Sequence, residues 1–121
     1  MNKILIIEDE QDTAKVLIKR LSVEGFNICV ASDAYRGVEL TLKERPDLII
    51  LDLMLPAGGG LSVLKNIKAS NYSQTIPVVV LTGINDEVYK QQVLDEGVEA
   101  YLEKPYDHNT LIATIKNILK I

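Results

Sequence analysis

The sequence predicts an α/β protein, a doubly wound (βα)5 sandwich of three layers with five parallel strands in one sheet. Short, continuous apolar runs alternate along the chain with longer segments of helical periodicity. Within the runs, apolar and polar residues do not alternate, which is typical of strands that are covered on both faces. Because one strand and one helix recur five times, we expect right-handed crossovers and helices on both faces of the sheet.

The expected strands are the apolar runs themselves, at residues 4–7, 28–31, 47–53, 77–82 and 100–105. Ile, Leu and Val dominate the first, third and fourth runs, and these runs are too short to be helices. The second run is weaker in apolar character, and the fifth is the least regular.

The expected helices lie between these runs, at residues 12–24, 34–45, 60–70, 86–96 and 107–121. Their buried faces are expected at Ala14, Leu17, Ile18 and Leu21 in the first, Ala34, Val38, Thr41 and Leu42 in the second, Leu61, Leu64 and Ile67 in the third, and Leu111, Ile112, Ile115, Ile118 and Leu119 in the fifth. The fourth helix is sparsely apolar, so it should pack least firmly and end at Gly97. Asp107 is the expected N-cap of the fifth.

Length and charge limit the function classes. A chain of 121 residues fits one domain over residues 1–121, and 13 basic against 17 acidic residues give a net charge of −4. A protein that binds the phosphate backbone needs the opposite balance, so direct nucleic-acid binding is not expected. The single cysteine, Cys29, excludes an internal disulfide, and the first apolar stretch is interrupted at Glu8, too early for a signal peptide or a membrane span. These features predict a cytoplasmic protein that does not contact membranes.

Polar residues stand at the ends of the apolar runs, where open parallel sheets bind ligands. Glu8 and Asp9 follow the first run, Asp52 lies near the end of the third, Thr82 ends the fourth and Lys104 ends the fifth. Taken singly, Asp9 reads as a helix N-cap and Lys104 as a solvated lysine. Together they predict three carboxylates, a hydroxyl and an ammonium at one edge of the sheet.

Such a cluster favours a divalent cation. Two carboxylates about 5 Å apart repel by roughly 3 kcal/mol at an effective dielectric constant near 20, and Lys104 supplies a single positive charge. Oxygen ligands suit Mg²⁺, with Mn²⁺ as the alternative. Asp52 lies within the apolar segment LIILDLML, where a carboxylate is costly to bury. We therefore expect Asp52 to be a nucleophile that forms an aspartyl phosphate.

These motifs together resemble the receiver domain of two-component response regulators, over essentially all of residues 1–121. The resemblance depends on four segments in order, namely ILIIEDE, DLIILDLMLP, VVVLTG and YLEKP. It implies a flavodoxin-like fold with strand order 2-1-3-4-5.

The resemblance implies that Asp52 accepts a phosphoryl group from a phosphohistidine on a sensor histidine kinase or a histidine phosphotransfer protein. Glu8, Asp9, Asp52 and the backbone carbonyl of Met54 would hold Mg²⁺. Lys104 would contact the phosphoryl oxygens and stabilise the charge spread over them.

The resemblance also implies a conformational switch. The Thr82 hydroxyl would bind a phosphoryl oxygen, and Tyr101 would then move inward. The surface that changes would comprise residues 86–96, 100–104 and 107–121, and it would bind a downstream effector protein or a fused output domain, or form a homodimer on phosphorylation. The bond between Lys104 and Pro105 is expected to be cis.

The chain departs from the family pattern in its loops. The segment PAGGG, at residues 56–60, lacks the usual acidic residue, and we expect it to be mobile. Neither Ile84 nor Met54 can orient an attacking water, which predicts slow hydrolysis of the acyl phosphate. His108 is expected to be exposed and Cys29 to be a small buried hydrophobe.

Three alternatives remain open at this point. The chain could be the receiver piece of a larger regulator or hybrid kinase, or a degenerate receiver that works as a constitutive interaction module. A flavodoxin-like carrier of a cofactor such as FMN would share the fold, but the acidic segment EDEQD after the first strand would repel the phosphate of FMN.

Overall fold

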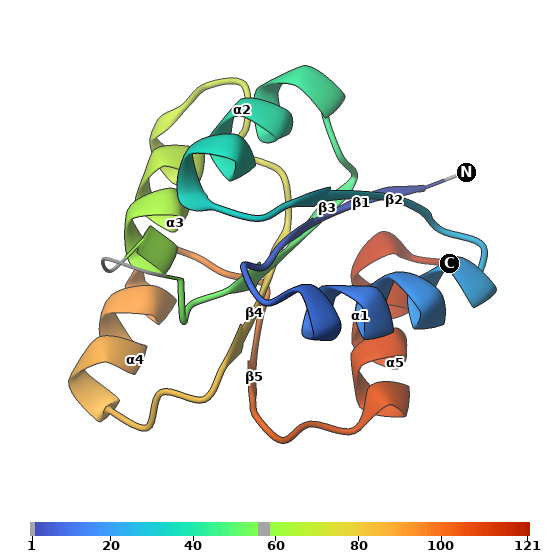
Figure 1. Ribbon diagram of the computed structural model, residues 1–121. Coiled ribbons are helices and arrows are strands. Elements are labelled where there is room, and N and C mark those ends of the chain that lie inside the picture. Colours follow the sequence, from blue (N-terminus) through green and yellow to red (C-terminus); the bar gives the residue numbers. More distant parts are fainter. Residues whose placement is uncertain (1, 56–58) are drawn as a thin grey trace.

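The computed structural model describes residues 2–55 and 59–121, and five strands and five helices follow one another there in strict alternation (Figure 1). The strands are β1 (Lys3–Ile7), β2 (Asn27–Ala31), β3 (Leu48–Asp52), β4 (Val78–Thr82) and β5 (Ala100–Glu103). The helices are α1 (Gln11–Val23), α2 (Ala34–Glu44), α3 (Gly59–Ala69), α4 (Glu87–Asp95) and α5 (His108–Leu119). The predicted alternation is confirmed.

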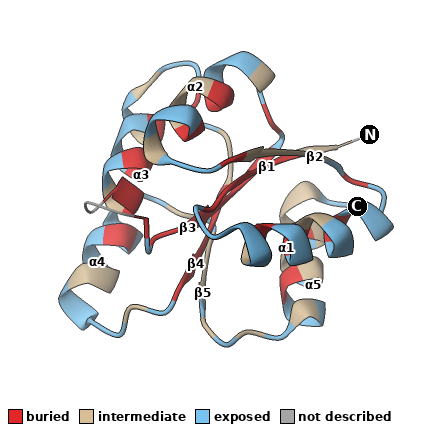
Figure 2. Cartoon of the chain, viewed as in Figure 1, coloured by how far each residue is buried: buried red, intermediate tan, exposed pale blue. Residues whose placement is uncertain are grey.

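The strands form one parallel sheet in the order β2-β1-β3-β4-β5, which confirms the predicted topology. Every residue of β3 and β4 is buried, whereas β2 and β5 at the two edges are mostly half-buried (Figure 2). This difference explains why the sequences of the central strands are continuous apolar runs, whereas those of the edge strands are less apolar.

The helices cover the two faces of the sheet and create two cores. Helices α2, α3 and α4 pack on one face, around β-strand residues such as Leu5 and Leu51. Helices α1 and α5 pack on the other, around Ile4 and Ile50. Successive residues of each strand thus point to opposite cores, as the strand period of two requires. Full burial of one such side chain contributes about 1.5–3 kcal/mol to folding.

The buried face of α2 differs from the prediction. Gly37, Leu40 and Thr41 are buried, whereas Leu42 is 47% exposed. A Cβ atom at Gly37 would lie 2.9 Å from the side chain of Ile7, so the helix approaches the sheet most closely at this glycine. This close approach turns Leu42 toward solvent, and the expectation that Leu42 is buried was wrong.

The helix termini carry the expected signals. The side chain of Asp107 accepts a hydrogen bond from the backbone N–H of Thr110, which confirms it as the N-cap of α5. Gly97 has a positive φ of 88° just beyond α4, as a helix stop requires. In the described chain, α4 buries one residue, Val93, which agrees with the expectation that this helix packs least firmly.

The expectation of a mobile PAGGG loop falls partly on residues 56–58, which lie outside the described residues. The next two glycines begin α3, and a Cβ at Gly60 would lie 2.5 Å from the backbone oxygen of Leu53. Glycine is therefore required where α3 meets the end of β3. None of the helices in residues 2–55 and 59–121 is both long and apolar enough to span a bilayer.

Candidate functional site: an acidic cluster with one lysine

The sheet brings Glu8, Asp52, Thr82 and Lys104 to one edge, at the carboxyl ends of four neighbouring strands. Asp52 is the last residue of β3 and lies beside Leu81, next to Thr82 on β4. The Nζ atom of Lys104 lies 2.5 Å from Oδ2 of Asp52 and 4.0 Å from Oε1 of Glu8. The structure thus places two carboxylates around one ammonium.

Asp52 is held in place through both of its carboxylate oxygens. It is 3% exposed, because it continues a strand that is buried on both sides. The backbone N–H of Met54 donates a hydrogen bond to Oδ1 at 2.8 Å, and Lys104 donates to Oδ2. The carboxylate therefore has a fixed orientation at the edge of the sheet.

The pKa of Glu8 is strongly raised by its surroundings. Glu8 is 4% exposed, and its Oε2 accepts a hydrogen bond of 3.2 Å from the backbone N–H of Glu10. Burial, followed by the Asp52 carboxylate beside it, raises the pKa of Glu8 from 4.5 to about 8, although the Lys104 ammonium acts in the opposite direction. One lysine therefore does not balance two buried carboxylates.

Hydrogen bonds hold both the side chain and the backbone of Lys104 in place. Burial acts to lower the pKa of its ammonium, but the hydrogen bond and charge of Asp52, and then the charge of Glu8, outweigh burial and raise that pKa. The backbone N–H of Lys104 donates to the carbonyl of Thr82 at 2.8 Å, and the bond to Pro105 is cis. The ammonium therefore stays charged and points at Asp52.

Thr82 and Tyr101 lie on the side of the sheet that faces α4. Thr82 is fully buried, and its hydroxyl accepts a hydrogen bond of 2.9 Å from the backbone N–H of Ile84. Tyr101 is half-buried on the edge strand β5, with the ammonium of Lys90 5.3 Å from the centre of its ring.

Met54 and Gly83 lie next to each other beyond the ends of β3 and β4. Met54 is 53% exposed, and its sulfur lies 3.1 Å from the position that a Cβ atom at Gly83 would occupy. A side chain at residue 83 would therefore push the methionine aside, and glycine leaves room for it.

Unlike Glu8, Asp9 forms no ion pair with Lys104 in the described part of the chain. Asp9 is exposed directly after Glu8, and in residues 2–55 and 59–121 no three His, Cys, Asp or Glu side chains converge on one metal position. The roles of Asp9 and of the Met54 carbonyl as ligands therefore stay predictions. The donor chemistry does fit Mg²⁺, because two buried carboxylates with one lysine leave negative charge to be balanced and oxygen is the ligand that this ion prefers.

Two residues without an assigned role differ from the expectation. His108 is half-buried, its ring contacts Tyr106 edge to face at 5.6 Å between centroids, and its Nδ1 has no hydrogen-bond partner among the described residues. Cys29 is half-buried rather than buried, because it lies on the edge strand β2.

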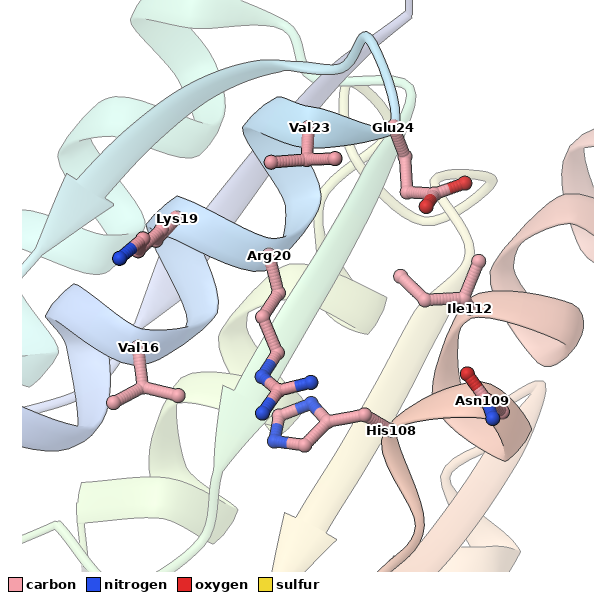
Figure 3. A pocket seen from close by; sticks show the side chains of 8 residues that line it. All are labelled: Val16, Lys19, Arg20, Val23, Glu24, His108, Asn109 and Ile112. Carbon is pink, nitrogen blue, oxygen red and sulfur yellow. The ribbon is translucent and has the colours of Figure 1, made fainter.

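His108 also lines a groove of about 470 Å³ between α1 and α5, and Arg20 of α1 extends into the same groove (Figure 3). Val16 and Ile112 form apolar parts of the wall. None of the residues of the acidic cluster lines this groove, so the two features are separate.

Comparisons with known proteins agree with one another. The family model for the response regulator receiver domain matches residues 4–116. The response regulator ArlR of Staphylococcus aureus strain Mu50 is 38% identical over 120 residues, which cover 99% of this chain and 53% of ArlR. The chain thus spans about half the length of this curated relative.

Solved structures share the fold over almost the whole chain. A two-component response regulator from Clostridium difficile superposes with a TM-score of 0.91 at 32% identity, covering 99% of this chain and 97% of its own. The receiver domain of the sensor histidine kinase PA1611 from Pseudomonas aeruginosa, solved with a magnesium ion coordinated in its active-site cleft, has a TM-score of 0.86 at 25% identity and covers 96% and 95% of the two chains.

Proposed function

Since the chain belongs to the family of response regulator receiver domains, we propose that Asp52 is its phosphoryl acceptor. The observation that carries this proposal is the buried cluster of Glu8, Asp52 and Lys104 at the carboxyl edge of the sheet. A buried carboxylate fixed by a backbone N–H and an ammonium is suited to attack, because its position costs no further ordering.

In the proposed reaction, a carboxylate oxygen of Asp52 attacks the phosphorus of a phosphohistidine on a sensor histidine kinase or a histidine phosphotransfer protein. The bond between phosphorus and the imidazole nitrogen breaks, and its electron pair stays on that nitrogen. Lys104, already 2.5 Å from Asp52, stabilises the negative charge on the phosphoryl oxygens. The products are an acyl phosphate on Asp52 and a free histidine.

Mg²⁺ is the proposed metal, with Mn²⁺ as the alternative. Glu8, Asp9, Asp52 and the backbone carbonyl of Met54 would hold it, and the magnesium in the cleft of the PA1611 receiver supports this assignment. Bound there, the ion would offset the repulsion between the carboxylates and the incoming phosphoryl group.

We propose that phosphorylation is read through the surface of α4, β5 and α5. A phosphoryl group adds about −1.5 to −2 charges at pH 7, and the Thr82 hydroxyl lies on the adjoining strand, one residue after the partner of Asp52. Rotation of Thr82 toward the phosphoryl group would release its bond to Ile84 and leave room for Tyr101. An effector protein, a fused output domain or a second copy would bind the changed surface in the cytoplasm.

A small phosphodonor tests the proposal. The protein is incubated with acetyl phosphate and Mg²⁺, and its intact mass is measured for the wild type, Asp52→Asn and Asp95→Asn. Asp95 is an exposed aspartate at the end of α4, outside the site. One phosphoryl group on the wild type and on Asp95→Asn, and none on Asp52→Asn, is expected. Equal labelling of all three proteins would contradict the assignment.

A further inference from the structure

We propose that Lys90 is a positioning residue. It holds the ring of Tyr101 in the half-buried position seen here and so opposes the inward movement of that ring when Thr82 switches. The inference rests on the proposed function, because it concerns the movement that phosphorylation of Asp52 would cause. Its basis is the pair of contacts from Lys90 to Tyr101 and to Glu103, called here the Lys90 contacts.

The Lys90 contacts join α4 to the edge strand. The Nζ atom of Lys90 lies 5.3 Å from the ring centroid of Tyr101 and 3.6 Å from Oε1 of Glu103. Tyr101 and Glu103 are two residues apart on β5, so both side chains lie on the same face of the sheet. One ammonium on α4 thus reaches two successive side chains of that face.

Few apolar side chains hold α4 against the sheet. Within the described chain, Val93 is the one residue of α4 that is buried, Tyr89 packs on the same core while partly buried, and Val88 is 73% exposed. The Lys90 contacts add a polar link from this lightly packed helix to β5.

The strand register connects these contacts to Thr82. Tyr101 lies beside Val80 and Glu103 lies beside Thr82 in the parallel pairing of β4 and β5. Tyr101 packs against the core that contains Val80, so its ring lies on the same face as the Thr82 side chain. In the proposed switch the ring leaves its present position, in which its centroid lies 5.3 Å from the ammonium. Lys90 therefore stabilises the resting arrangement relative to the switched one.

The size of the effect follows from the exposure of the groups. Lys90 and Glu103 side chains are 34% and 61% exposed, so the ion pair and the cation–π contact each contribute modestly. Together they correspond to a bias of about fivefold in the ratio of resting to switched protein. Loss of the contacts should raise the affinity for a phosphoryl analogue by the same factor.

The test uses beryllofluoride, an analogue of the phosphoryl group, with saturating Mg²⁺. The whole protein is labelled with 3-fluorotyrosine and titrated by ¹⁹F NMR, and Tyr101→Phe assigns the signal of residue 101. Lys90→Gln removes both contacts, and Lys90→Arg keeps a cation over the ring. Lys3→Gln is the matched control, because it breaks the similarly exposed ion pair of Lys3 with Glu44, 3.3 Å long, at the start of β1 and outside the surface of α4, β5 and α5.

Lys90→Gln should bind beryllofluoride about fivefold more tightly than the wild type, while Lys90→Arg and Lys3→Gln stay within about twofold. In the absence of beryllofluoride, the signal of Tyr101 in Lys90→Gln should shift toward its saturated position. In a Tyr101→Leu background, Lys90→Gln should have no effect on affinity, which a general change in stability would not reproduce.

Equal affinities of the wild type and Lys90→Gln would overturn the role of Lys90 and leave the proposed function intact. A gain in Lys3→Gln as large as in Lys90→Gln would do the same, since any lost surface charge would then suffice. A wild type that binds no beryllofluoride would instead overturn the proposed function itself, and the role of Lys90 with it.

Discussion

Replacing Glu8 by glutamine should remove a marked dependence of stability on pH. Burial and the neighbouring Asp52 raise the pKa of Glu8 to about 8 in the folded protein, against 4.5 for an ordinary glutamate. Between these values the folded state keeps a proton that the unfolded chain has lost. The free energy of unfolding of the wild type should therefore fall as the pH rises from about 4.5 to 8.

The magnitude follows from the shift. One pKa unit corresponds to about 1.4 kcal/mol, so the difference between 4.5 and 8 corresponds to a loss on the order of 5 kcal/mol. The Glu8 side chain is 3% exposed, so solvent screens this effect little. The loss is a large part of the stability of a typical small domain, about 5–15 kcal/mol.

Urea unfolding from pH 5 to pH 8 in EDTA measures the effect, with Glu8→Gln compared with the wild type and with Glu96→Gln. Glu96 lies at the end of α4, outside the site. The wild type and Glu96→Gln should lose stability together across this range, whereas Glu8→Gln should stay nearly level. Saturating Mg²⁺ should abolish the loss, because a cation can then balance the ionised carboxylates. Parallel curves for all three proteins in EDTA would refute the reasoning.

Three further outcomes are expected. Gly60→Ala should lower the free energy of unfolding by about 1–3 kcal/mol in urea, because its Cβ would lie 2.5 Å from the backbone of Leu53, and an unchanged midpoint would contradict this close approach. Lys104→Gln should slow the phosphorylation of Asp52 by acetyl phosphate about 100-fold, measured as intact mass after the reaction is quenched at set times. A rate equal to that of the wild type would show that Lys104 does not take part in the reaction. The acyl phosphate of the wild type should last minutes or longer when its decay is followed with a radiolabel, because the apolar Met54 beside Gly83 orients no water, and a lifetime of seconds would be inconsistent with that arrangement.

Most of the fold could be predicted because its central strands are covered on both faces. The runs that became β1, β3 and β4 contain little but Ile, Leu and Val, so their period and length exclude helices. The residues of the acidic cluster were identified for a related reason. In a parallel sheet, whatever follows a buried run is placed at the same edge as whatever follows the next one.

Features that depend on close contact between distant segments could not be predicted. The approach of Gly37 to Ile7 turned Leu42 outward, and no spacing within α2 records how near the helix lies to the sheet. The contact of Lys90 with Tyr101 is between α4 and β5, and the periodicity within either element does not indicate which of their side chains meet. The raised pKa of Glu8 likewise needs the distance to Asp52 and the depth of burial, which only the folded chain supplies.

A crystal structure of the protein with Mg²⁺ and beryllofluoride tests the central claim most directly. The account predicts beryllium bonded to a carboxylate oxygen of Asp52, with Lys104 and the Thr82 hydroxyl on its fluorines. It predicts the metal on Glu8, Asp9, Asp52 and the carbonyl of Met54. A metal bound away from these oxygens, or beryllium on any other carboxylate, would contradict the account.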